Sequence, residues 1–234
     1  MIEALINEVT DPNMMARLAR GRAKNKVELL EQSLKGLVGP HQRLMLSTQL
    51  RHIDFLDQEI ARLDQEIGDR MRPFEEVLEL LDTIPGVGRR TAEQILAEIG
   101  IDMERFPTAA HLASWAGMAP GNNESAGKRY SGKTRKGNKV LRETLIEAGR
   151  AAARTKNTYL SAQYRRLAPR RGSKRAAVAV GHTILTICFH IIKDRVPYYE
   201  LGADYFDRRK KDAVLKAALK RIEALGYKVN IEAA

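Results

Sequence analysis

The apolar residues between positions 46 and 67 recur with a period of seven. The a positions of these heptads are Leu46, Ile53, Ile60 and Ile67, and the d positions between them include Leu56 and Leu63. This pattern predicts a long helix with a coiled-coil seam, and Ile at a with Leu at d favours two parallel strands. The same stripe would also serve a hairpin of two helices formed with residues 13–38 of the same chain. The pattern leaves both pairings open.

Residues 1–38 also have helical spacing. Asp11-Pro12 is a start signal, and Gly36 with Gly39-Pro40 is a stop signal, so we expect a helix that ends before residue 40. Basic residues crowd its middle, where they form either a phosphate-facing stripe or a solvated helix face. These residues are Arg17, Arg20, Arg22, Lys24 and Lys26.

A helix-hairpin-helix pattern follows Pro73, and this proline ends or restarts the preceding helix. In LLDTIPGVGRRTAEQILAEIG an apolar helix end runs into a Gly-x-Gly turn and a second helix. Gly86 and Gly88 would let the backbone approach a phosphate at the positive end of that helix. Arg89 and Arg90 add charge there and favour a DNA-contacting helix-hairpin-helix over a plain αα-hairpin.

The longest apolar run spans residues 176–192. It is 17 residues long and includes two His, two Thr and one Gly, so it is shorter than the ~20 apolar residues of a spanning helix. We expect a buried helix rather than a membrane anchor, although basic residues precede the run. Phe106 and Trp115, beside apolar neighbours, are expected to pack in the core.

These patterns predict a mainly α protein in which any strands are short. The expected parts are a helical or coiled-coil region at residues 1–72, a helix-hairpin-helix domain at 73–160 and a helical extension at 161–234. With 44% apolar and 29% charged residues in 234, the composition excludes a wholly disordered chain. Cys188 is the only cysteine and the five histidines lack ligand spacing, so no metal site is expected.

The net charge of the chain indicates what kind of partner it binds. Forty Lys and Arg against 29 Asp and Glu give a formal charge of +11, which indicates a polyanion, with nucleic acid as the leading candidate. The densest chemistry lies in residues 117–142, an expected loop with five glycines and seven basic residues. Its hydroxyl groups could place a nucleophile against a phosphodiester, or the loop could bind DNA without chemistry. The expected DNA contacts here are Lys128, Arg129, Lys133, Arg135, Lys136 and Arg142.

The hairpin at residues 80–100 followed by SWAGMAPGNNESAGKRYSGKTRKGN resembles the carboxy-terminal half of the DEDD-type insertion-sequence transposases, the bridge-RNA-guided recombinases of bacterial mobile elements. Blocks such as LARGRAKNKVELLEQSL and TYLSAQYRRLAPRRGSKRAAVAVGH extend the resemblance along the chain. In that family a serine attacks the DNA backbone and becomes joined to it. The matching residue is Ser125, with Ser131 as the second candidate because the spacing between Gly132 and Gly137 is tight.

The resemblance also implies an acidic, Mg²⁺-binding resolvase-like domain, for which the helical first 75 residues offer no substitute. We therefore expect a truncated transposase that is inactive alone and an enzyme only when complemented, with Mg²⁺ required only with that domain. The alternative is a non-catalytic DNA-binding or dimerisation fragment that regulates a full-length transposase. Expected partners are DNA, a guide RNA and a second copy paired through residues 46–67, with no membrane, in the bacterial cytoplasm near the nucleoid.

Overall fold

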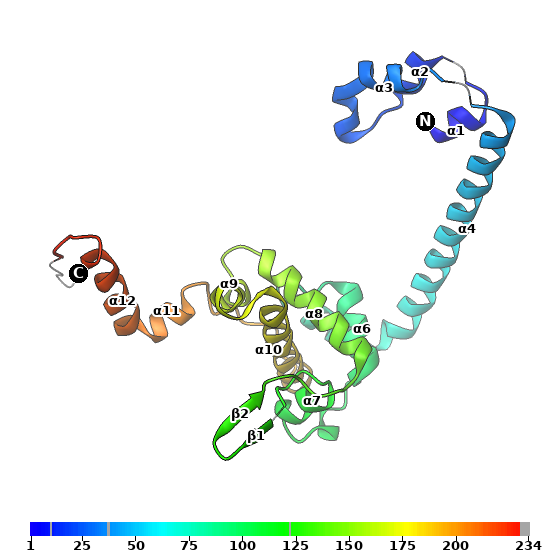
Figure 1. The fold of residues 1–234 in the computed structure, drawn as a ribbon. Helices are drawn as coiled ribbons and strands as arrows, with labels where there is room; N and C mark the ends of the chain where they lie inside the picture. Colours follow the sequence, from blue (N-terminus) through cyan, green and yellow to red (C-terminus); the bar gives the residue numbers. More distant parts are fainter. Residues whose placement is uncertain (10, 37, 122, 230–234) are drawn as a thin grey trace. The chain divides into compact units, whose positions relative to one another are not determined.

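A computed structural model describes residues 1–9, 11–36, 38–121 and 123–229, without the side chains of Asn123 and Arg129. The chain divides into two compact units, Met1–Arg72 and Pro73–Ala234. Helices make up nearly all regular structure in the described residues, and β1 and β2 are short strands (Figure 1). The prediction of a mainly α protein is therefore confirmed.

Short helices fill the first part of unit one, where the sequence predicted a single helix up to residue 38. The elements are α1 (Ile2–Ile6), α2 (Pro12–Arg17), the 3-10 helix η1 (Gly21–Lys26) and α3 (Val27–Ser33). The start signal is correct, because the Asp11 carboxylate accepts a hydrogen bond of 2.9 Å from the Asn13 N–H and caps α2. The continuous helix is wrong: Gly21 has a φ of +58°, a left-handed conformation that interrupts it.

Helix α4 (Pro40–Met71) contains the heptad pattern, so the predicted long helix is confirmed. It contacts α1 near its beginning, where Arg43 bonds to the Leu5 carbonyl at 3.2 Å and to Glu8 at 3.1 Å. The predicted helix hairpin with residues 13–38 is wrong, since α3 packs against α2 and η1 instead. The seam side chains remain solvent-exposed, with exposures between 41% and 55% at Ile53, Leu56, Ile60, Leu63 and Ile67.

The core of unit two forms around α10 (Ser173–Asp194). This helix packs against α5 (Glu75–Asp82), α7 (Ala109–Trp115), α8 (Lys139–Arg154) and α9 (Tyr159–Arg171). Small residues bring α8 and α10 together: a Cβ on Gly149 would lie 2.7 Å from the Ala177 carbonyl, and one on Gly181 would lie 2.6 Å from the Leu145 carbonyl. The later residue of α8, Gly149, faces the earlier residue of α10, Ala177, and Leu145 faces Gly181, so the two helices are antiparallel.

Helix α10 is long and apolar enough to cross a membrane by length and composition alone, but 56% of its most apolar window is buried inside the protein. The prediction of a buried core helix is confirmed. Cys188 on this helix is fully buried, and the lost hydration of its thiolate raises the pKa of the thiol to about 12.

The residues after α10 attach to the core through aromatic contacts. Tyr159 of α9 packs against Tyr205 and Phe206 of α11 (Tyr205–Arg209), with ring centroids 5.1 Å apart in both pairs. Arg166 bonds to Asp207 at 2.8 Å. Helix α12 (Lys211–Glu223) follows and has no buried residue. The expected boundary between residues 160 and 161 falls inside α9, within this unit.

Two smaller elements precede the region that the sequence singled out. They are α6 (Arg89–Ile99) and the 3-10 helix η3 (Met103–Arg105), while η2 (Arg72–Phe74) joins α4 to α5. Phe106 and Trp115 form a tilted pair with centroids 5.5 Å apart. The expectation that Trp115 lies in the core is wrong, because 44% of this residue is exposed. It covers Phe106 at the edge of the unit rather than filling the interior.

Candidate functional site

A β-hairpin occupies part of the segment that the sequence predicted to be a loop (Figure 1). Strands β1 (Asn123–Ser125) and β2 (Lys128–Ser131) are antiparallel, and Ser125 lies opposite Lys128. The connection is Ala126-Gly127, with φ values of +50° and +72°. Positive φ at both central residues matches the twist of a two-residue hairpin turn, and this explains why strands form where glycines suggested a loop.

Ser125 lies at the tip of this hairpin. Its side chain is exposed, and no described residue forms a hydrogen bond with its hydroxyl group. Ser131 differs, because its hydroxyl accepts a hydrogen bond of 3.1 Å from the Lys133 N–H and is only partly exposed. Tyr130 is 68% exposed. Of the two candidate serines, Ser125 is therefore the one whose oxygen is available to an incoming group.

Close backbone contacts fix the base of the hairpin. A Cβ on Gly137 would overlap the Gly117 nitrogen, and Gly117 itself has a φ of +69°. Arg142 donates to the Gly117 carbonyl at 2.6 Å and to the Thr134 hydroxyl at 2.5 Å. The partly buried Arg142 guanidinium thus joins the two ends of the segment. This role depends on residues that are far apart in the sequence and was not predicted, while the expected contact of Arg142 with DNA stays a prediction.

Exposed basic side chains lie on and after strand β2 of the hairpin. Lys128, Lys133, Arg135 and Lys136 are all exposed, and within the described part of the chain none has an ion pair; we call these four residues the hairpin cluster. The side chain of Arg129, also expected to contact DNA, lies outside the described residues. Since no ion pair in the described part of the chain holds these four side chains, the hairpin cluster offers positive charge to a polyanion, although the exposed Glu124 carboxylate lies beside Ser125.

Gly86 and Gly88, which the sequence analysis treated together, have different surroundings in the turn between α5 and α6. Gly86 has a φ of +89° and faces α8: a Cβ there would lie 2.5 Å from the Ala152 nitrogen and 2.6 Å from the Ala148 carbonyl. Helix α8 therefore fills the side of Gly86 that a side chain would occupy, and the expected approach of the Gly86 backbone to a phosphate stays a prediction. Gly88 is exposed with nothing within 4 Å of its Cβ position, and as the N-cap of α6 it leaves that helix end open.

Arg89 and Arg90 are both exposed at the start of α6. The Arg89 guanidinium bonds to both carboxylate oxygens of Glu75, one at 2.8 Å, and to Glu93 at 2.6 Å. These bonds lower the pKa of the Glu75 carboxyl and raise the pKa of Arg89. Two carboxylates already compensate Arg89, which links α5 to α6 through Glu75, and its contact with DNA stays a prediction.

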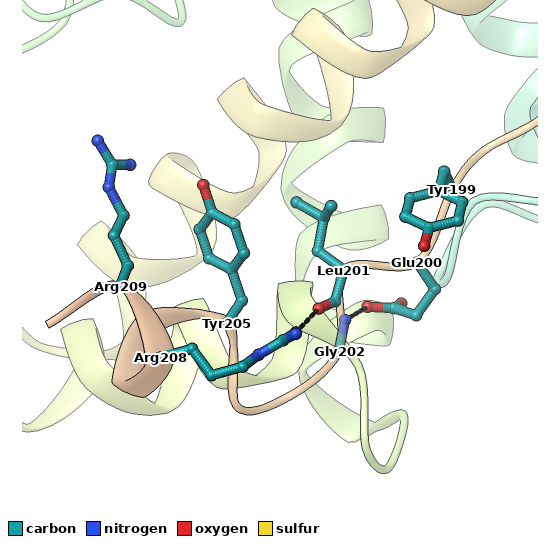
Figure 2. A pocket seen from close by; sticks show the side chains of 7 residues that line it. All are labelled: Tyr199, Glu200, Leu201, Gly202, Tyr205, Arg208 and Arg209. Carbon is teal, nitrogen blue, oxygen red and sulfur yellow. Dashed lines mark hydrogen bonds between the residues drawn. The ribbon is translucent and has the colours of Figure 1, made fainter. Parts of the chain in front are cut away.

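No group of three or more His, Cys, Asp or Glu side chains in the described ranges could hold a metal ion. A pocket of about 590 Å³ lies elsewhere, between residues 199 and 209 (Figure 2). Arg208 donates to the Leu201 carbonyl at 2.7 Å and Glu200 accepts from the Gly202 N–H at 2.8 Å, so its polar groups hold the chain in place. None of the predicted site residues lines it.

Comparison with known proteins finds a family and several relatives that resemble the part of the chain containing the hairpin. Residues 78–165 match the transposase IS116/IS110/IS902 family. The pilin gene-inverting protein of Moraxella bovis is 26% identical over 191 residues, which cover 79% of this chain and 58% of that protein. The insertion element IS110 uncharacterized 43.6 kDa protein of Streptomyces coelicolor is 45% identical over 69 residues, covering 29% of this chain and 16% of that protein.

The mini-circle putative transposase for IS117 of the same Streptomyces is 36% identical over 93 residues, covering 40% of this chain and 22% of that protein. The chain spans 58% of the length of the Moraxella bovis protein it matches. The matched residues 78–165 run from α5 into α9 and include the hairpin with Ser125. From α5 to the beginning of α9, this chain is therefore similar to the transposase IS116/IS110/IS902 family.

Proposed function

We propose that this protein takes part in DNA transposition or recombination, with Ser125 as the nucleophile that becomes joined to a DNA strand. The observation that carries the proposal is the exposed, unbonded Ser125 hydroxyl at the tip of a hairpin whose base is fixed by Gly117, Gly137 and Arg142. This hairpin lies within the family-matched residues. The names of the relatives, which include a transposase and a gene-inverting protein, support the same class of reaction.

The proposed step is a transesterification at phosphorus. The Ser125 oxygen forms a bond to phosphorus, the bond to one deoxyribose oxygen breaks, the serine proton passes to a base, and the departing oxygen takes up a proton. Lys128, opposite Ser125 in the register, and the rest of the hairpin cluster would stabilise the added negative charge at phosphorus. No described side chain contacts the Ser125 hydroxyl as a base, so the base would come from another part of the assembly.

The second candidate function is a DNA-binding and dimerisation fragment without catalysis. Two observations favour it: Ser125 has no activating partner in the described structure, and the seam of α4 is exposed and ready to pair. With either function the protein would act on DNA in the bacterial cytoplasm. A guide RNA, which the resemblance implies, is a further proposed partner. The two candidates differ in covalent chemistry but share DNA binding, which can be tested first.

DNA binding should depend strongly on salt. If six or more phosphates are contacted, affinity for a duplex of arbitrary sequence should fall by about 10³ between 50 and 200 mM salt, because bound counterions are released. Changing the four residues of the hairpin cluster to Gln should lower affinity for all sequences alike and reduce the salt slope by up to about 3.6. Fluorescence anisotropy over a salt series measures both quantities.

A matched control variant removes the same charge elsewhere. Lys210, Lys211, Lys216 and Lys220, at or within exposed α12, can be changed to Gln together and should reduce the salt slope less than the hairpin variant does. Arg89→Gln should also have a smaller effect than Lys136→Gln, since Glu75 and Glu93 already compensate Arg89. Absence of binding to any nucleic acid at 50 mM salt would contradict the proposed function.

We also propose that two copies pair in parallel through residues 46–67. Ile60→Asp should then convert a dimer into a monomer, because an unpaired charge buried in the seam costs several kcal/mol. Gln58→Asp adds the same charge on the outer face of α4 and should leave the dimer intact. Sedimentation at tens of micromolar protein distinguishes the two states. A wild-type protein that sediments as a monomer at this concentration would exclude the dimer.

The charges beside the seam predict how pairing responds to salt. The e and g positions over residues 57–66 are all acidic, namely Asp57, Glu59, Asp64 and Glu66. In a parallel pair these carboxylates of the two copies approach each other, although Glu59 and Glu66 also bond to Arg62 and Arg70 within the helix. Added salt screens the repulsion and should strengthen pairing modestly, the opposite of its effect on DNA binding.

A further inference from the structure

The positive charge of this protein is concentrated in one continuous segment. Residues 148–193 contain ten Lys and Arg and no Asp or Glu, whereas the whole chain has a formal charge of +11. This segment forms the end of α8, all of α9 and nearly all of α10. It is separate from the hairpin cluster, and the sequence motifs assigned it no function beyond a possible lead-in to an apolar helix.

Ion pairs with residues outside the segment account for two of its cations. Arg150 pairs with Glu147 at 2.6 Å, and Arg166 pairs with Asp207 at 2.8 Å while lying 5.3 Å from the Phe206 ring centroid. Five exposed residues around the junction of α9 and α10 have no acidic partner in the described part of the chain. We call them the corner cluster: Arg165, Arg170, Arg171, Lys174 and Arg175.

The backbone at this junction brings the end of α9 and the start of α10 together. Gly172, with a φ of +83°, is the only residue between α9 and α10, so the end of one helix and the start of the next are held close together. No side chain caps the beginning of α10, and its first turn carries Lys174 and Arg175. The first N–H groups of this 22-residue helix thus lack a side-chain cap, while its positive dipole end lies next to the negative end of α9, so the basic side chains carry the positive charge of the junction.

The corner cluster and the hairpin cluster lie at opposite ends of the layer formed by α8 and α10. Because these helices are antiparallel, the start of α10 lies beyond Gly149, toward the end of α8. The hairpin base is instead tied to the beginning of α8 through Arg142. The 16 residues of α8 rise ~24 Å, so a duplex contacting both clusters would be held over about seven base pairs.

The charge and the few aromatic residues of the corner cluster indicate which kind of nucleic acid it would bind. Cations without interspersed carboxylates suit a phosphate backbone. Recognition of single strands needs exposed aromatic rings for stacking, and the only aromatic residue between positions 160 and 180, Tyr164, is partly buried. We propose that the corner cluster is a second binding surface for the phosphate backbone of duplex DNA. This inference rests on the proposed function, since it assumes that the protein acts on DNA.

The test compares three sets of five substitutions to Gln in the full chain. The first changes the corner cluster, the second changes the hairpin cluster together with Lys139, and the third changes Lys210, Lys211, Lys216, Lys220 and Arg221 at or within α12. Each variant loses the same charge. Binding to a 12-base-pair and a 30-base-pair duplex of arbitrary sequence is measured at several salt concentrations, with circular dichroism to check helix content.

We expect the corner variant to bind the 30-base-pair duplex at least tenfold more weakly than the α12 variant, with a salt slope smaller by about 0.9 for each phosphate that the protein no longer neutralises. A corner variant that binds as tightly as the α12 variant, while the hairpin variant loses affinity, overturns this inference and leaves the proposed function standing. Failure of the wild-type protein to bind duplex DNA overturns both. A loss confined to a structured RNA or to anionic vesicles overturns the assignment of duplex DNA.

Discussion

Ser125→Ala is expected to abolish covalent attachment of the protein to DNA. The reaction would be run with the acidic, metal-binding domain implied by the resemblance, and the adduct would be detected by denaturing electrophoresis of labelled DNA. Removing one hydroxyl removes the attacking oxygen, and the hydroxyl of Ser131, the second candidate, already accepts a hydrogen bond from the Lys133 N–H. DNA affinity should change less than twofold, because the hairpin cluster is untouched and an exposed Ser→Ala change alters stability by less than about 0.5 kcal/mol.

The neighbouring hydroxyl groups provide the controls. Ser131→Ala should retain the adduct, since this hydroxyl is engaged with the Lys133 N–H. Tyr130→Phe should retain it as well. An adduct that survives in Ser125→Ala and disappears in Ser131→Ala would move the nucleophile to Ser131, whereas loss only in Tyr130→Phe would assign tyrosine chemistry. If the wild-type protein binds DNA but never forms an adduct with the added domain, the non-catalytic candidate function holds.

Gly86→Ala should strongly destabilise unit two. A φ of +89° is strained for any residue with a Cβ, and the new methyl group would overlap the α8 backbone at Ala148 and Ala152. Because those atoms are backbone, the turn must move away from α8, and we expect a loss of about 4 kcal/mol in the free energy of unfolding. Alkylation of Cys188 reports this loss, since its buried thiol, with a pKa of about 12, reacts only when the core opens.

Gly88→Ala is the matched control two residues away. Its φ of −103° suits alanine, and its Cβ position faces open space. The expected cost is about 1 kcal/mol, from replacing glycine at a helix N-cap. If the two variants were equally stable, the close packing of the turn on α8 would be wrong. If Gly86→Ala were stable and lost only DNA affinity, the glycine would contact phosphate, as the sequence alone suggested.

Local patterns were sufficient where the structure depends on near neighbours. The heptads predicted α4, Asp11-Pro12 predicted the start of α2, and the apolar run at residues 176–192 predicted a buried α10. Each is set by side chains three or four residues apart or by a cap beside the helix. Residues 1–38 show the limit of this reasoning, because Gly21 interrupts a helix that the apolar spacing alone would continue.

The roles of individual residues required the tertiary structure. From sequence, Gly86, Gly88, Arg89 and Arg142 formed one class of DNA-contacting residues, but only contacts between distant segments distinguish them. Helix α8 packs against Gly86 where a side chain would lie. Glu75, fourteen residues before Arg89, bonds to its guanidinium, and Arg142 bonds to the Gly117 carbonyl at the base of the hairpin.

The sequence by itself thus determined a mainly α, basic protein, placed the long helices α4 and α10 and marked Ser125 as a candidate through its resemblance to a family. Only the tertiary structure decided which cations are already neutralised and which glycines are already packed. The physical reason is that charge and shape complementarity act between atoms within a few ångströms, and residues distant in sequence reach that separation only once the chain has folded.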